Sequence, residues 1–286
     1  MANPPKVGLA VGMDRRSVIT LMMAGGLAAC SSPPKSTASR QRKSVETIRY
    51  GDDPAQFGEL SRATGASKGV VVVIHGGFWR EAYDLSLGRP LAASLISHGW
   101  NAFNLEYRRV GNGGGWPETF DDVADGIDAL ATVKGLDTTK VITLGHSAGG
   151  HLAVWAAGRP KLTGTNWAHP AVPITAAISQ AGVLDLAGSV KENLGSGATQ
   201  AFMGGTVDGR YREADPTAQI PLAVPVRCIH GRSDDTVPLS QSIGYVDRAR
   251  AAGADAELAE VEGDHFVVID PTSRAWGRTL EILESL

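Results

Sequence analysis

Cysteine is scarce in this sequence, which contains only Cys30 and Cys228 among its 286 residues. Two cysteines are too few for a fold that depends on several disulfide bonds, or for a metal cluster with several thiolate ligands. Cys228 lies in an apolar stretch, where a thiol usually packs as a small hydrophobic side chain. The sequence therefore predicts a fold that is stabilised by an apolar core.

An excess of basic residues is also missing. The chain has 27 Lys and Arg against 30 Asp and Glu, which gives a net charge of -3. Such a balance provides no basic surface for a nucleic acid. With 43% hydrophobic and 20% charged residues, the composition is typical of a soluble globular protein and excludes a disordered or fibrous chain.

No long hydrophobic run occurs near the N-terminus. Residues 17–29 are uncharged, but this run of thirteen residues is too short to cross a bilayer as a helix. It follows Arg15-Arg16 and precedes Cys30 through small residues, an order that is typical of an export signal. We therefore expect a signal over residues 1–30 and, from its polar Ser, Pro, Lys and Arg content, a flexible linker over 31–44.

From about residue 45 to residue 286, strand-like and helix-like segments alternate. This alternation predicts one α/β domain with a mostly parallel central sheet that helices cover on both faces. Residues 184–222 are rich in glycine and polar residues and interrupt the alternation, so we expect an insertion there. The predicted strands are 70–74, 101–107, 141–144, 174–181, 226–229 and 257–261, and the predicted helices are 85–98, 118–133, 148–157, 243–252 and 273–286.

A candidate nucleophile lies between a predicted strand and a predicted helix. Residues 145–149 read Gly-His-Ser-Ala-Gly, the G-x-S-x-G pattern in its expected strand-to-helix context. The sharp turn exposes the Ser147 hydroxyl at a helix N-terminus, where developing negative charge is favoured. A serine needs a base, and that base needs an acid to orient it.

His265 is the best candidate for the base, because it lies in the loop between the last strand and the last helix. Asp234 and Asp235 both follow the strand 226–229 and are the candidate acids. Adjacent aspartates cannot both point at one imidazole, so we expect one of them to be solvated. Among the other histidines, His146 is expected to point away from Ser147, and His75 and His230, which end strands, are expected to brace backbone.

A glycine-rich turn follows the strand 70–74, where residues 75–79 read His-Gly-Gly-Phe-Trp. Glycines let the backbone approach a bound acyl group and direct N–H groups at its oxygen. Together with the amide of Ala148, this turn is a candidate oxyanion hole. A second glycine run, 111–115, misses the dinucleotide spacing because Trp116 replaces the last glycine, and no H-E-x-x-H zinc pattern occurs. We expect no cofactor and no metal.

Four motifs together resemble the α/β-hydrolase superfamily: His-Gly-Gly-Phe-Trp, Gly-His-Ser-Ala-Gly-Gly, His-Gly-x-x-Asp-x-x-Val-Pro and Gly-Asp-His-Phe. The likeness covers residues 45–286 and is greatest to the esterase and kynurenine formamidase (arylformamidase) branch, to which His-Gly-Gly-x-Trp points. By position, the resemblance implies a catalytic triad and an oxyanion hole. The triad is Ser147, His265 and Asp234, with Asp234 preferred over Asp235, and the oxyanion donors are Gly77, Phe78 and Ala148.

The N-terminal segment resembles that of bacterial lipoproteins. Residues 27–30, Leu-Ala-Ala-Cys, are similar to a lipobox, in which the cysteine is lipidated and becomes the mature N-terminus. Arg15-Arg16 resembles a twin-arginine signal. The resemblance implies an exported protein of the periplasm or cell envelope that is anchored to the membrane at Cys30. Either Met1 or Met13 is the translation start.

The predicted function is a serine hydrolase that cleaves a small carboxylic ester through an acyl-enzyme. Trp79, Tyr83 and Trp116 lie near the expected site and are candidates for lining its substrate pocket. The alternatives are an arylformamidase that hydrolyses N-formylkynurenine, a peptidase-like hydrolase, a non-catalytic binding protein on the same fold, and a structural lipoprotein.

Overall fold

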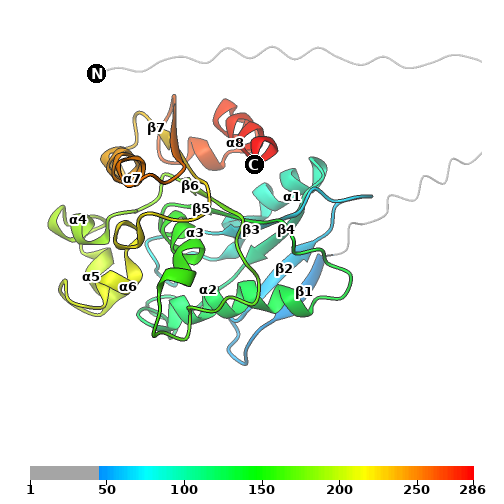
Figure 1. Ribbon diagram of the computed structural model, residues 1–286, viewed down its shortest axis with the longest axis horizontal. Helices are drawn as coiled ribbons and strands as arrows, with labels where there is room; N and C mark the ends of the chain where they lie inside the picture. Colours follow the sequence, from blue (N-terminus) through cyan, green and yellow to red (C-terminus); the bar gives the residue numbers. More distant parts are fainter. Residues whose placement is uncertain (1–44) are drawn as a thin grey trace, which may run out of the picture. The chain divides into compact units, whose positions relative to one another are not determined.

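One eight-stranded sheet organises residues 45–286, the part of the chain that the computed structural model describes (Figure 1). The predicted export signal, the lipidation site Cys30 and the linker 31–44 lie outside these residues. The spatial order is β1-β2-β4-β3-β5-β6-β7-β8. The six strands β3 to β8 are parallel to one another, whereas β1 is antiparallel to β2 and β2 is antiparallel to β4. The strands are β1 Val45–Arg49, β2 Phe57–Ser61, β3 Val70–Ile74, β4 Asn101–Leu105, β5 Val141–His146, β6 Ala176–Gln180, β7 Val226–Gly231 and β8 Ala256–Val261.

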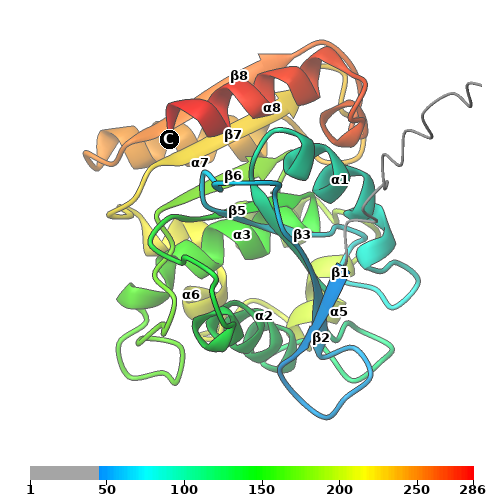
Figure 2. The same ribbon diagram turned by 90° about the vertical axis from the view of Figure 1, so that its right-hand side faces the viewer.

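Helices cover both faces of this sheet (Figure 2). One face is covered by α1 (Arg89–Ser97) and α8 (Arg274–Ser285), and the other by α2 (Glu118–Asp128), α3 (Ala148–Gly158) and α7 (Ser240–Ala251). The prediction of a mostly parallel α/β sheet covered on both faces is confirmed. Within residues 45–286, no helix is both long and apolar enough to span a membrane.

Strand β3 shows why the sheet needs both layers. Its five residues are all apolar and buried, and successive side chains of a strand point to opposite faces. Val71 and Val73 pack with the residues of α1 and α8, whereas Val70, Val72 and Ile74 pack with those of α2 and α3. A run of β-branched residues without polar alternation is what a central parallel strand requires.

The antiparallel edge was not predicted, and the structure shows how the inserted segment folds. Strands β1 and β2 were not predicted, because their mixture of charged and apolar residues has no continuous buried run. The expected insertion 184–222 folds into short helices that pack through Leu186, Phe202 and Met203 onto the α2–α3 side of the core. These helices are α4 Leu186–Lys191, α5 Ala198–Met203, α6 Tyr211–Ala214 and the 3₁₀ turn η4 Pro216–Gln219.

The predicted site residues follow the carboxyl ends of parallel strands. The glycine-rich turn follows β3, Ser147 follows β5, Asp234 follows β7, and His265 follows β8. Carboxyl ends of parallel strands lie at one edge of a sheet, and that edge is where ligands bind in open α/β sheets. The topology thus brings residues from distant parts of the sequence to one rim.

Candidate active site

Ser147 lies on a sharp, strained turn between β5 and α3. Its backbone has φ 56° and ψ -120°, a conformation that costs free energy for a residue with a side chain. A Cβ atom added to Gly145 would lie 2.0 Å from the Gly149 carbonyl oxygen, and one added to Gly149 would lie 2.1 Å from the Ile74 carbonyl oxygen. Both flanking positions of the G-x-S-x-G pattern therefore require glycine for steric reasons.

His265 and Asp234 are joined by a short hydrogen bond. The ring nitrogen Nδ1 of His265 lies 2.6 Å from Oδ2 of Asp234, whose side chain is shielded from solvent. Oδ1 of Asp234 accepts hydrogen bonds from the backbone N–H groups of Thr236 (2.9 Å) and Val237 (2.8 Å). Asp235 is exposed instead. The structure therefore pairs the imidazole with Asp234.

The carboxyl group of Asp234 is held as an anion. Burial alone would raise its pKa, but hydrogen bonds from His230, His265 and the Val237 N–H outweigh burial and hold the pKa well below its usual range. A carboxylate that accepts several hydrogen bonds keeps its charge far into the acid range. An ionised partner also requires the proton of a neutral His265 ring to reside on Nδ1.

Ser147 and His265 line the same pocket, which has a volume of about 110 Å³. The triad candidates therefore come together although Ser147 and His265 are 118 positions apart in the sequence. Most of the pocket wall is apolar. Its other lining residues are Gly77, Phe78, Tyr83, Leu87, His146, Thr236, Phe266 and Ile269.

His146 contacts the candidate base, a contact that the sequence did not predict. Its Nε2 lies 2.9 Å from the His265 carbonyl oxygen, and the two rings are 4.5 Å apart. Burial, reinforced by the neighbouring His265, lowers the pKa of His146 to about 3, so the ring is neutral and Nε2–H donates to the carbonyl. The residue beside the serine thus connects the β5 turn to the loop that carries His265.

His230 was expected to brace backbone, and it also reaches the acid. Its Nε2 lies 2.9 Å from the Val237 carbonyl oxygen and 3.1 Å from Asp234 Oδ2. The sequence signal for this contact is the spacing of four residues within His-Gly-x-x-Asp. The motif identified Asp234 as the candidate acid but did not predict its contact with His230.

The turn after β3 approaches the serine closely. Gly77 has φ 114° and Phe78 has φ 55°, and a Cβ on Gly76 would lie 2.7 Å from the His146 carbonyl oxygen. Within residues 45–286, the N–H groups of Gly77 and Phe78 donate to no protein acceptor. With the N–H of Ala148 at the start of α3, these are the donors that the sequence proposed for an oxyanion.

Buried side chains behind this turn fix its shape. The Tyr107 hydroxyl donates to the His75 carbonyl oxygen at 2.7 Å, and the two rings stack with centroids 4.4 Å apart. His75 Nδ1 donates to the Gly76 carbonyl oxygen at 2.8 Å. Burial lowers the pKa of His75 to about 3, which keeps the ring neutral. His75 therefore braces the backbone of the turn, as its position predicted.

Of the three predicted pocket aromatics, only Tyr83 lines the pocket. Trp79 is 1% exposed and stacks on Phe202 with ring centroids 4.6 Å apart, so its assignment to the pocket was wrong. Trp116 is partly buried and packs edge-to-face against Phe120 and Trp167 outside this pocket, so its assignment was also wrong. The reason is local: the turn at residues 77–79 directs Phe78 to the pocket and Trp79 to the core. Leu87, Phe266 and Ile269 line the pocket without any sequence signal.

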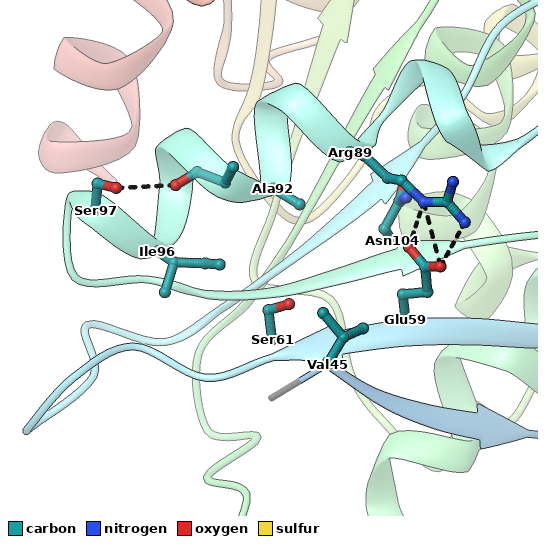
Figure 3. Close-up of a pocket in the computed structure, with 9 residues that line it drawn as sticks. Val45, Glu59, Ser61, Arg89, Ala92, Ile96, Ser97 and Asn104 are labelled. Carbon is teal, nitrogen blue, oxygen red and sulfur yellow. Dashed lines mark hydrogen bonds and ion pairs between the residues drawn. The ribbon is translucent and has the colours of Figure 1, made fainter. Parts of the chain in front are cut away.

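A larger groove of about 470 Å³ lies between α1 and the β1–β2 edge (Figure 3). Its wall is mostly apolar, and Arg89 forms an ion pair with Glu59 at 2.7 Å beside it. No predicted catalytic or oxyanion residue lines this groove. Among residues 45–286, no group of three or more His, Cys, Asp or Glu side chains is arranged to hold a metal ion.

The sequence pattern of the BD-FAE family matches residues 60–248, about two thirds of the chain. The chain belongs to the BD-FAE family. This chain has the α/β-hydrolase fold, because esterase B from Lactobacillus rhamnosis superposes on it with a TM-score of 0.72 at 21% sequence identity. This match covers 85% of the BD-FAE chain and 84% of the esterase B chain.

Two curated relatives of this BD-FAE chain are named as esterases. Esterase LipC of Mycobacterium tuberculosis is 29% identical over 242 residues, which cover 77% of this chain and 59% of LipC. The isoprenylcysteine alpha-carbonyl methylesterase ICME of Arabidopsis thaliana is 25% identical over 236 residues, which cover 76% of this chain and 55% of ICME. The match thus spans less than two thirds of each relative.

Buried histidines should make the stability of the fold depend on pH. Burial lowers the pKa values of His75 and His146 to about 3 and that of His151 to about 4. Unfolded histidines take up protons below about pH 6.5, whereas these buried rings do not. The free energy of unfolding should therefore fall as the pH is lowered from about 6.5 toward 4, by about 1.4 kcal/mol per pH unit for each ring. Urea unfolding at several pH values measures this slope.

A matched pair of variants tests the assignment to buried rings. His151→Gln should reduce the slope by the share of one histidine, because it removes one ring that protonates only on unfolding. His98→Gln, which changes an exposed ring, should leave the slope as it is. An unchanged slope in His151→Gln would contradict the account.

Proposed function

We propose that the protein is a serine esterase that hydrolyses a small carboxylic ester through an acyl-enzyme. The observation that carries the proposal is the 2.6 Å hydrogen bond between His265 and a buried, ionised Asp234, with His265 and Ser147 lining one pocket. A carboxylate-paired imidazole beside a serine is the combination that activates a serine hydroxyl, and this supports the proposal. Membership of the BD-FAE family and the esterase names of two relatives support the same reaction.

In the proposed mechanism, the ionised Asp234 keeps the His265 proton on Nδ1 and leaves Nε2 free to accept one. The Ser147 hydroxyl transfers its proton to Nε2 as its oxygen attacks the ester carbonyl. His265 then donates that proton to the departing alkoxide, which leaves as an alcohol and produces the acyl-enzyme. A water molecule that His265 activates in the same way hydrolyses the acyl-enzyme and releases the acid.

The oxyanion of each tetrahedral intermediate is proposed to bind at the N-terminus of α3. The N–H groups of Gly77, Phe78 and Ala148 are the proposed donors, and the positive end of the α3 dipole adds to their effect. Donors that are held in place before the reaction need no reorganisation as charge develops. The stacked His75 and Tyr107 rings support this role by fixing the turn.

The substrate is proposed to carry a short acyl group. A pocket of about 110 Å³ with an apolar wall suits a small acyl chain better than a peptide segment. An ester is preferred to an N-formyl amide because the named relatives are esterases. The pocket mouth includes the exposed side chains of Tyr83, Leu87 and Phe266, which suit an apolar leaving group.

Ser147→Ala should lower kcat for p-nitrophenyl acetate by about 10⁴-fold or more, because the nucleophile is lost. Ser61→Ala, which changes a serine in the groove of Figure 3, is the matched control and should retain activity. Turnover of Ser147→Ala at the rate of the unmodified protein would remove the nucleophile assignment.

The same assay resolves the substrate class. Rates with p-nitrophenyl acetate, a feruloyl ester and N-formylkynurenine should rank the acetate above the formamide. A higher kcat/KM for N-formylkynurenine would replace the ester proposal with an arylformamidase. Absence of turnover on any ester, formamide or peptide would favour a binding protein on the same fold.

Asp234→Asn should lower kcat by about 10⁴-fold, because an amide no longer stabilises the required His265 tautomer or its protonated form. Asp235→Asn should change kcat little, since this side chain is exposed and does not contact the imidazole. Steady-state kinetics of the two variants side by side make the comparison. The reverse order of effects would exchange the roles of the two acids.

We also propose that the protein is exported and lipid-anchored at Cys30, because the residues before it resemble a lipobox. Radiolabelled palmitate should be incorporated into the full-length protein in a bacterial host and not into Cys30→Ala. Cys228→Ala is the matched control and should label normally, because this thiol is buried in the fold. Equal labelling of Cys30→Ala and the unmodified protein would refute the anchor.

A further inference from the structure

His230 lies behind the Asp234 carboxylate, on the side opposite to His265 in the hydrogen-bond chain. It is the fifth residue of β7, and its side chain is fully buried. Its Nδ1 is 2.8 Å from the Ser242 hydroxyl oxygen on α7, and its Nε2 is 2.9 Å from the Val237 carbonyl oxygen and 3.1 Å from Asp234 Oδ2. The mechanism proposed above does not use this imidazole.

These contacts determine which nitrogen of His230 carries the proton. Nε2 faces two acceptors, the Val237 carbonyl and the Asp234 carboxylate, so it must bear the hydrogen. In the neutral ring, Nδ1 is then an acceptor, and the Ser242 hydroxyl donates to it. Hydrogen bonds therefore run from Ser242 through His230 to the Val237 carbonyl oxygen, and the same Nε2–H lies 3.1 Å from Asp234 Oδ2, close enough to stabilise its charge.

Asp234 is surrounded by donors as a result. Oδ1 accepts from the Thr236 and Val237 N–H groups, and Oδ2 is shared between His265 Nδ1 at 2.6 Å and His230 Nε2 at 3.1 Å. Two imidazoles on one oxygen compete for its charge. Each donor that Oδ2 accepts reduces the negative charge available to stabilise a protonated His265.

We propose that His230 is a positioning residue of the triad, which holds the Asp234 carboxylate in its rotamer and moderates the affinity of His265 for a proton. This inference rests on the esterase function proposed above. It adds a fourth side chain, and Ser242 as its support, to the three groups that carry out the reaction.

Within residues 45–286, the other titratable groups that lie beside Asp234 and His265 are neutral or exposed to water. On the β5 side, His146 faces His265, and burial keeps it neutral by lowering its pKa to about 3. On β7, burial raises the pKa of the Cys228 thiol to about 12, so it is neutral as well. Asp264, next to His265, is exposed and accepts from the N–H groups of Phe266 and Val267. Its charge is therefore screened by water.

The variant His230→Leu removes the Nε2 donor, because it replaces the imidazole with an apolar side chain of similar size. Oδ2 then serves His265 alone, so the protonated form of His265 becomes more stable. Its titration midpoint, followed by NMR of the imidazole, should rise by about one pH unit, since a hydrogen bond to a charged group has a free energy near that of one unit of pKa. The acid limb of the kcat/KM profile should move to higher pH by the same amount.

His230→Gln is the conservative variant, because its Nε2 amide can donate where the imidazole Nε2 donates. It should return both the midpoint and the acid limb to near their original values. His98→Gln, an exposed histidine, is the control that should move neither. If His230→Leu does not fold, Ser242→Ala should move both in the same direction by less, because it removes the hydroxyl that orients His230.

The two readouts separate this inference from the proposed function. A raised midpoint in His230→Leu that His230→Gln reverses supports the positioning role. An unchanged midpoint in a folded His230→Leu overturns it, even where activity falls, because the residue is then only structural. The NMR titration needs no turnover, so a protein that hydrolyses no ester would refute the esterase proposal while the midpoint still decides the role of His230.

Discussion

An ionised carboxylate without access to water is the constraint on which this site depends. Removing an anion from water is costly unless hydrogen bonds replace its hydration. Asp234 receives those hydrogen bonds from its own loop and from the loop after β8, and the His230 ring at the end of β7 lies 3.1 Å from it. The need to stabilise one charge therefore holds together three segments that the sequence separates. His265 is oriented as a consequence.

A second constraint is steric and acts at the serine. The positive φ of Ser147 is tolerated because Gly145 and Gly149 allow backbone contacts that no side chain would permit. His146 connects this rigid turn to the proposed base, since its ring packs on His265 and its Nε2 donates to the His265 carbonyl oxygen. The end of β5 thus carries the proposed nucleophile and also contacts the loop of the proposed base.

Local sequence predicted the parts of the site that depend on local geometry. The Gly-His-Ser-Ala-Gly turn, the His-Gly-Gly turn and the order of the parallel strands could be recognised because glycine positions and β-branched runs have direct steric causes. Two contacts were not predicted from the sequence: that of His146 with His265 and that of His230 with Asp234. They depend on side-chain directions across strand ends, which sequence spacing does not determine.

The pocket lining also depends on backbone directions and tertiary packing that the sequence does not determine. Trp79 was assigned to the pocket from its proximity to the turn, but the two positive φ values at Phe78 and Trp79 direct it into the core. Leu87, Phe266 and Ile269 come from segments that only the tertiary fold brings together. The antiparallel strands β1 and β2 escaped prediction because one edge of a sheet tolerates polar residues that a central strand does not.

Helix α3, which begins beside the serine, is connected to the segment 184–222 by two hydrogen bonds. His151 Nε2 donates to the Ala214 carbonyl oxygen and Trp155 Nε1 to the Glu213 carbonyl oxygen, both at 2.9 Å. If the chain around residue 214 moved outward, the buried side chains of His151 and Trp155 would each lose a hydrogen-bond acceptor. A force that pulls on this segment would therefore act on helix α3, whose first turn lies next to the Ser147 hydroxyl.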